Sequence, residues 1–223
     1  LGKTSEVEEA LETSRVEWVS YKGDITVSGL YETLFINRHK LIVFDDCDSV
    51  FSKKNEESVN MLKAALDTKK KREISRVLKT SYDSTGMSDA EMQKIFDEKG
   101  QLPRTFNYNG RIIIITNVPG ENIDEALISR GLHVDVDLTI EQILARMRKL
   151  MDKLFPNYSR DKKEETLEFM NYLISNYESK FPLNIRTLIH CINIRISNDF
   201  LMDVGGERVP VWQLLVKSYL LKK

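Results

Sequence analysis

Apolar positions along this chain follow two different spacings in turn, and the alternation predicts its secondary structure. Apolar residues three and four positions apart predict helices over residues 4–13, 26–37, 56–69, 88–99 and 123–130. Short runs rich in β-branched and aromatic residues predict strands over residues 16–21, 40–46, 111–117 and 133–138. Helices that alternate with buried strands favour an α/β fold, in which a parallel sheet carries helices on both faces.

Beyond residue 139 the pattern is helical throughout. A long amphipathic helix is predicted over residues 140–155, and Pro156-Asn157 interrupts it. Three further helices are predicted over residues 161–179, 184–198 and 211–221. The pattern therefore predicts an α/β domain over residues 1–155 and a small all-helical domain over residues 156–223.

Between residues 72 and 110 the apolar pattern weakens. Turn-forming residues dominate positions 82–86 and 107–110, and only residues 88–99 show helical spacing. A connection of this length is unusual between neighbouring elements, and functional loops concentrate in such stretches. Two interpretations remain open, an insertion without a role in function and an element that contacts a substrate.

Composition indicates an ordinary globular protein. Of the 223 residues, 41% are hydrophobic and 30% are charged, and no apolar run reaches the length of a membrane span. The net charge of −1 gives no support for a nucleic-acid surface, and the basic run 69–72 suits a solvated helix end better than a DNA contact. Cys47 and Cys191 are far apart, and no metal spacing is present. We expect a cytoplasmic protein with no membrane association.

The first residues resemble the end of a phosphate-binding loop. Gly2-Lys3-Thr4 matches the last part of G-x-x-x-x-G-K-[ST], the Walker A motif. In such a loop Lys3 contacts the β- and γ-phosphates of a nucleotide, and the Thr4 hydroxyl is a ligand of Mg²⁺. The alternative is an ordinary helix start with Thr4 as its N-cap. Because the motif begins inside its pattern, we expect a strand and a glycine-rich loop upstream of Leu1.

Two predicted strands end in polar side chains. Asp45 and Asp46 follow one apolar run, and Asn117 follows another. Ligands of open parallel sheets bind at the carboxyl ends of the strands, so these side chains are candidates for one site. Asp45 suits a Walker B aspartate that holds Mg²⁺ directly or through water. Asn117 has a simpler interpretation as a strand-end residue before the turn at 118–120.

The order and spacing of these motifs resemble the AAA+ ATPase superfamily over essentially the whole chain. The resemblance implies a P-loop domain followed by a helical lid, with ATP and Mg²⁺ as cofactors and a ring-type homo-oligomer as the assembly. Thr116-Asn117 is similar to sensor 1, whose amide helps to position the attacking water. Residues 126–130 resemble the clamp-loader segment that ends in an arginine finger, here Arg130, and residues 183–186 resemble the start of a lid helix with a sensor 2 arginine, here Arg186.

Each arginine also has a plain structural interpretation, Arg130 as a helix cap and Arg186 as a surface residue. Residues 44–48 together with 62–67 are similar to uncharacterised AAA ATPases of tailed phages, which would place the protein in the host cytoplasm. The family implies a client of DNA or protein, and no known DNA-binding domain or pore motif is visible in the sequence.

One position departs from the family pattern. The family has glutamate after the Walker B aspartate as the base toward water, and this chain has Asp46, which is one methylene shorter. Asp46 is therefore either a water-orienting residue with slow hydrolysis or a carboxylate that only supports the metal site or its loop. We accordingly expect an ATP hydrolase, with a nucleotide-gated assembly scaffold of little turnover as the alternative.

Overall fold

The computed structural model describes residues 3–222, and within that range the protein is a mixed α/β structure with ten α-helices and a small parallel sheet. The chain folds into two compact units, and the boundary between them lies between Val134 and Asp135. Each unit has its own hydrophobic core.

The sheet of the first unit has three parallel strands in the order β1-β2-β5. Lys22, Asp45 and Ile115 lie side by side at its carboxyl edge, as the register shows. The strands predicted over residues 16–21, 40–46 and 111–117 are confirmed, with bounds of β1 (Trp18–Lys22), β2 (Leu41–Asp45) and β5 (Arg111–Ile115).

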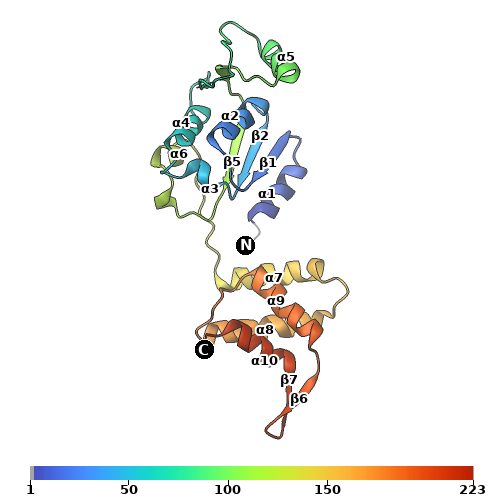
Figure 1. The fold of residues 1–223 in the computed structure, drawn as a ribbon. Coiled ribbons are helices and arrows are strands. Elements are labelled where there is room, and N and C mark those ends of the chain that lie inside the picture. Colours follow the sequence, from blue (N-terminus) through green and yellow to red (C-terminus); the bar gives the residue numbers. More distant parts are fainter. Residues whose placement is uncertain (1–2, 223) are drawn as a thin grey trace. The chain divides into compact units, whose positions relative to one another are not determined.

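Helices cover both faces of this sheet, as the apolar pattern predicted. Every residue of β2 is buried, because its side chains alternate between two apolar layers. Ile42 and Phe44 face the larger core, which contains residues of α2 (Val27–Ile36) and α4 (Glu56–Ala65). Leu41 and Val43 face α1 (Lys3–Glu12) on the other side, where they pack with Val7 and Leu11. Figure 1 shows these helices around the sheet.

Three short helices also belong to the first unit. The short helices are α3 (Asp48–Phe51), the 3₁₀ helix η1 (Gly120–Asn122) and α6 (Glu125–Ile128).

The strand predicted over residues 133–138 is wrong. These residues form no strand, although their apolar residues alternate. Val134 and Val136 are 65% and 55% exposed, so the alternating apolar side chains do not pack against a core. No strand within residues 3–222 pairs with this segment, which therefore lacks the ladder hydrogen bonds that define a strand.

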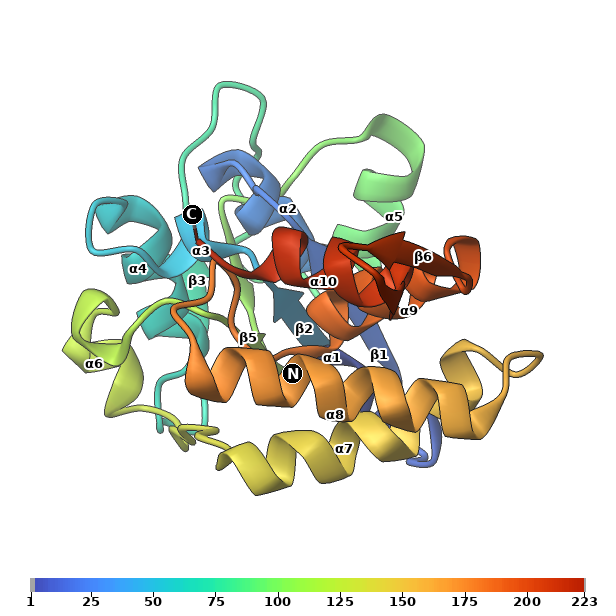
Figure 2. The ribbon, with the colours of Figure 1, turned by 90° about the horizontal axis from the view of Figure 1, so that it is seen from below.

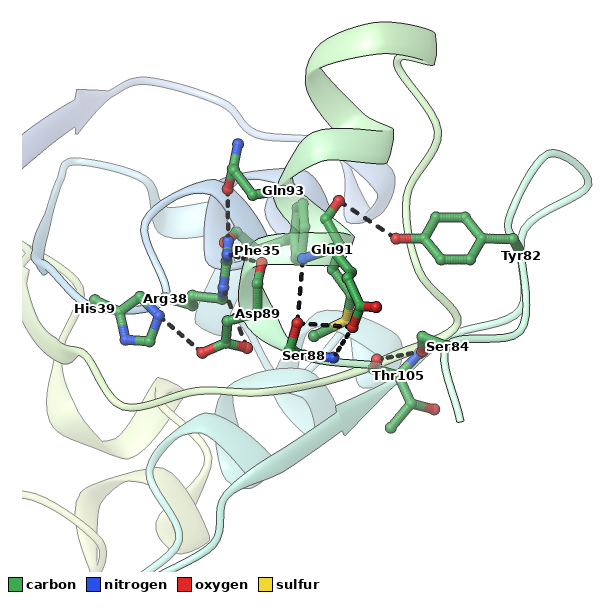
Figure 3. A network of polar contacts seen from close by, with 11 residues as sticks. Phe35, Arg38, His39, Tyr82, Ser84, Ser88, Asp89, Glu91, Gln93 and Thr105 are labelled. Carbon is green, nitrogen blue, oxygen red and sulfur yellow. Dashed lines mark hydrogen bonds and ion pairs between the residues drawn. The ribbon is translucent and has the colours of Figure 1, made fainter. Parts of the chain in front are cut away.

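The insertion over residues 72–110 is fixed to the end of the sheet opposite the carboxyl ends of the strands. It contains an antiparallel pair, β3 (Glu73–Ser75) with β4 (Thr105–Asn107), and helix α5 (Asp89–Lys99). Arg38, which precedes β2 and is only 4% exposed, holds α5 through Nη1 to Gln93 Oε1 at 2.9 Å and Nη2 to Asp89 O at 3.1 Å. Figure 3 shows this network, and Figure 1 shows α5 at the far end of the sheet.

Gly110, directly before β5, allows a close approach of two chain segments. A Cβ atom there would lie 2.3 Å from Lys40 O and 2.8 Å from Tyr108 Oη. We expect Gly110→Ala to lower the free energy of unfolding by about 1–3 kcal/mol, since backbone atoms must move to make room. Denaturant unfolding measures the effect. The matched control is Gly131→Ala, whose Cβ meets nothing within 4 Å and should leave stability unchanged.

The second unit is a helical bundle with a β-hairpin. Helices α7 and α8 run side by side (Figure 2), and one apolar core joins residues of all four helices. The four predicted helices are confirmed as α7 (Ile140–Leu154), α8 (Arg160–Asn176), α9 (Ile185–Ser197) and α10 (Val211–Leu220). Because Met147 and Met151 are buried in this core, α7 packs with the second unit. The sequence pattern had placed that helix in the first domain and the boundary at residue 156.

The expectation of an all-helical C-terminal part is wrong, because residues 201–210 form an antiparallel hairpin. Its strands are β6 (Leu201–Val204) and β7 (Glu207–Pro210). The turn between them uses Gly205 and Gly206 at φ values of 66° and 92°, which glycine adopts without steric cost. A Gly-Gly pair is a hairpin signal in the sequence, and Met202 and Val209 are register partners on its two sides. This turn signal was not used, because the helical patterns before and after it favoured an all-helical interpretation.

Candidate functional site

The site predicted from the sequence lies at the carboxyl edge of the sheet. Asp45 is the last residue of β2 and is only 5% exposed. Thr116 and Asn117 follow the last residue of β5, the neighbouring strand. Since the two strands are parallel and in register, their polar end residues are neighbours in space.

Helix α1 begins against these strand ends. Thr4 Oγ1 donates a hydrogen bond to Asp45 Oδ1 at 2.8 Å, and Lys3 Nζ donates to the Thr116 backbone oxygen at 2.5 Å. The first turn of α1 is thereby joined to both β2 and β5. The structure thus brings the start of α1 to Asp45, which lies 41 positions after Thr4, and to Thr116, which lies 113 positions after Lys3. Gly2, the third predicted residue of the phosphate loop, lies outside the described residues.

Asp46 has an unusual backbone conformation. Its φ of 53° lies in the left-handed region, where aspartate and asparagine are the most tolerated residues after glycine. Its N–H donates to Ile115 O at 3.0 Å, and its Oδ1 accepts a hydrogen bond from Asn117 Nδ2 at 3.2 Å. The turn therefore directs an exposed carboxylate toward an exposed amide, and the two groups can contact a common ligand or water molecule.

Sequence reasoning missed Asp48, which supports the end of β5. Asp48 Oδ1 accepts a hydrogen bond from Thr116 Oγ1 at 2.9 Å, and the same hydroxyl accepts one from Val118 N at 2.9 Å. Asp48 therefore fixes the segment that provides both the acceptor for Lys3 and the side chain of Asn117. The signal was a third carboxylate three positions after Asp45.

Sequence reasoning also missed Lys22 and Glu8. Lys22 Nζ lies 3.3 Å from Asp45 Oδ2 and 3.2 Å from Glu8 Oε1, so it forms ion pairs with both carboxylates. The hydrogen bonds to Glu8 and Asp45 raise the pKa of Lys22 above its ordinary value. The signal for Lys22 was its place directly after the strand predicted over residues 16–21, although its ion pairs depend on which strand lies beside it.

The Cys47 side chain lies in the core beside the site. Its side chain is fully buried, and its thiol donates to Tyr21 O at 3.3 Å. Burial raises the pKa of the Cys47 thiol, which keeps it protonated and unreactive. Cys47 therefore packs as a small core residue beside the site.

The oxygen atoms of Thr4 and Asp45 fit Mg²⁺ only together with other ligands. Within residues 3–222, no group of three or more His, Cys, Asp or Glu side chains is arranged to hold a metal ion. Mg²⁺ is commonly held by one or two protein oxygens, with substrate phosphates and water as the remaining ligands. A hydroxyl and a carboxylate in contact at 2.8 Å suit that mode of binding.

The two predicted arginines lie in different units of the chain. Arg130 follows α6 and is exposed, and its Nη1 donates to Ala126 O, one turn earlier, at 2.7 Å. This is the helix-cap arrangement. Arg186 is an exposed residue in the first turn of α9, which begins after the N-cap Asn184 in the second unit.

Comparison with known proteins adds a relation to a phage protein. The chain is 29% identical over 240 residues to the "uncharacterized 36.7 kDa protein in nrdC-mobD intergenic region" of Enterobacteria phage T4. The match covers 98% of this chain and 65% of that protein, so the chain spans a little under two thirds of its relative. No protein-family model and no solved structure matches the chain. Separately, none of the helices within residues 3–222 is both long and apolar enough to cross a membrane.

Proposed function

We propose that the protein is a P-loop ATPase of the AAA+ type that binds ATP with Mg²⁺ and hydrolyses it. The observation that supports this most directly is the hydrogen bond between Thr4 Oγ1 and Asp45 Oδ1. It joins the helix that follows Gly-Lys-Thr to the end of the strand that carries the Walker B candidate. Thr4 and Asp45 would hold Mg²⁺, which would neutralise charge on the phosphates.

The other residues at this edge have roles that follow from their position. The amide groups at the start of α1 and the ammonium of Lys3 would bind the phosphates, since both favour negative charge. In this structure Lys3 Nζ donates a hydrogen bond to Thr116 O, so the positive charge of Lys3 lies at the carboxyl ends of the strands. Asp46 and Asn117, in contact at 3.2 Å, would orient the attacking water.

Assembly and client are part of the same proposal. Arg130 would act on the nucleotide of a neighbouring subunit in a ring, and its exposure leaves it accessible to such a neighbour. The second unit would serve as the lid, with Arg186 directed toward nucleotide. The client would be DNA or a protein complex, in the cytoplasm of a phage-infected host.

The competing function is a scaffold in which ATP binding controls assembly with little turnover. One observation favours it, namely that Asp46 takes the place of the longer glutamate and its Oδ1 is engaged by Asn117. A carboxylate held in this way is less free to accept a proton from water.

The test of the proposed function is ATP binding by the full chain with and without Mg²⁺. We expect Asp45→Asn and Thr4→Ala each to weaken the Mg²⁺ dependence of binding, because each removes a proposed ligand. The matched control is Thr13→Ala, directly after the other end of this helix, where the hydroxyl donates to Ala10 O. Equal Mg²⁺ dependence in wild type and in all three variants would exclude the proposed site.

Asp46→Asn separates the ATPase from the scaffold. We expect this variant to keep ATP and Mg²⁺ binding and to lose about 10²–10⁴-fold in steady-state turnover, since the lost group acts on the transition state. Asp137→Asn, at an exposed position in the irregular segment after α6, is the control and should turn over normally. Normal turnover by Asp46→Asn would place the base elsewhere, and binding without turnover in the wild type would favour the scaffold.

A further inference from the structure

The ammonium of Lys22 forms an ion pair with Asp45, the carboxylate that we propose as a metal ligand. Lys22 is the register partner of Asp45 in the parallel sheet, so their side chains emerge on the same face. Its Nζ is 3.3 Å from Asp45 Oδ2, while Thr4 donates to the other oxygen, Oδ1. Each oxygen of this buried carboxylate therefore already has a partner from the protein.

The same ammonium is shared with a second carboxylate. Glu8 lies four residues after Thr4 on α1, so both side chains lie on the helix face that meets the strand ends. Glu8 Oε1 is 3.2 Å from Lys22 Nζ. The side chain of Glu8 is 32% exposed and that of Asp45 8%, which makes the position at Glu8 the better hydrated of the two. Lys22 thus has an alternative anion within reach if it loses Asp45.

A lysine ammonium and a divalent cation compete for a carboxylate. Both are attracted to the same oxygen atoms, and a nearby positive charge opposes the arrival of another. We propose that Lys22 is a positioning residue that holds Asp45 when no metal ion is bound and so sets the affinity of the site for divalent cations. Glu8, which already pairs with Lys22, keeps the ammonium when the metal ion displaces it from Asp45. This inference rests on the proposed function, because it takes Asp45 as a metal ligand.

Competition predicts opposite effects of removing Lys22 and of removing Glu8. Lys22→Met keeps the apolar stem and removes the competitor, so divalent-cation binding becomes tighter. Glu8→Gln removes the alternative anion, so Lys22 stays on Asp45 and binding becomes weaker. We expect changes of about two- to fivefold in each direction, the size of a partly exposed ion pair. A purely structural role would change stability and leave both affinities equal to the wild type.

The double variant, Lys22→Met with Glu8→Gln, distinguishes two explanations. Either Lys22 competes with the metal ion for Asp45, or the charges of Lys22 and Glu8 act on the metal ion independently. If Glu8 acts only as the alternative site for Lys22, then Glu8→Gln has no effect once Lys22 is removed. The double variant then binds as tightly as Lys22→Met alone. If the two charges act independently on the metal ion, their effects add and nearly cancel, and the double variant resembles the wild type.

The experiment measures the Mn²⁺ concentration that gives half-maximal binding of a non-hydrolysable ATP analogue to the full chain, because Thr4 and Asp45 suit a divalent cation only together with phosphate and water ligands. Lys40→Met, which removes a positive charge before the opposite end of β2, is the matched control and should bind as the wild type does. Thermal denaturation of each variant verifies that it is folded. An unchanged or weaker affinity in Lys22→Met, or a double variant equal to the wild type, would overturn the inference.

Asp45→Asn distinguishes failure of the metal site from failure of the role of Lys22 alone. If this variant binds Mn²⁺ as well as the wild type does, Asp45 is not a ligand, and both the proposed function and the role of Lys22 fail. If Asp45→Asn loses affinity while Lys22→Met stays at the wild-type value, the metal site stands and only the role of Lys22 is excluded.

Discussion

Lys3→Ala is expected to lower ATP affinity by about a hundredfold or more while the protein stays folded. A charge-assisted hydrogen bond to phosphate contributes about 1.5–3 kcal/mol, and Lys3 would contact two phosphates. Its contact in this structure is a single hydrogen bond to Thr116 O, whose loss costs the fold about 0.5–1.5 kcal/mol. Isothermal titration with ATP and Mg²⁺ measures the affinity, and thermal denaturation measures the stability.

The control for Lys3 is Lys79→Ala, which removes the same charge from an exposed position in the insertion. It should bind ATP as the wild type does. An unchanged affinity in Lys3→Ala would show that Gly2-Lys3-Thr4 is not a phosphate loop. Thr4 would then be no more than a helix residue that is hydrogen-bonded to a strand end.

Arg130 is expected to act in trans, with a loss of about 10³–10⁵ in turnover when it is removed. Lys3→Ala and Arg130→Ala subunits should each be inactive alone. Their mixture should regain activity, because one subunit offers the arginine and the other a working nucleotide site. Specific activity of the wild type should also rise with protein concentration as subunits assemble.

A second mixture serves as the control for this test. Lys3→Ala and Asp46→Asn both damage the site of their own subunit, so combining them should restore nothing. Full activity in dilute monomer, or no rescue between subunits shown to assemble together, would leave Arg130 as the cap seen here, bonded to Ala126 O. Arginine near a helix C-terminus is favoured by the helix dipole, so the cap needs no catalytic explanation.

The elements that could be predicted from the sequence are those whose burial pattern is complete within one segment. The strand at Leu41–Asp45 and the helix at Ile185–Ser197 have such patterns, and both were found within a few residues of their true bounds. The short pair β3 with β4 joins segments about 30 residues apart, and its three-residue strands carry almost no periodicity. Residues 133–138 show the converse, since alternation alone predicted a strand that has no neighbour to pair with among the residues described.

The candidate site was predictable to the extent that strand ends carry its residues. Asp45, Asp46 and Asn117 follow apolar runs, so a parallel sheet brings them together. The left-handed turn at Asp46 and the ion pairs of Lys22 were not predictable, because they depend on which strands are neighbours and in what register. The partners of Arg130 and Arg186 in an assembly depend on a second chain and on the placement of the two units, which one sequence does not specify.

The edge position of β5 has a consequence for the protein in solution. Within the described residues β5 pairs with β2 alone, so one side of a strand of four consecutive isoleucines has no neighbouring strand there. An apolar edge strand without proline or inward charge is a template on which other chains add. The strand that supports Asn117 is thus also where aggregation of these 223 residues is expected to begin. That tendency will limit the concentrations at which assembly of active subunits can be measured.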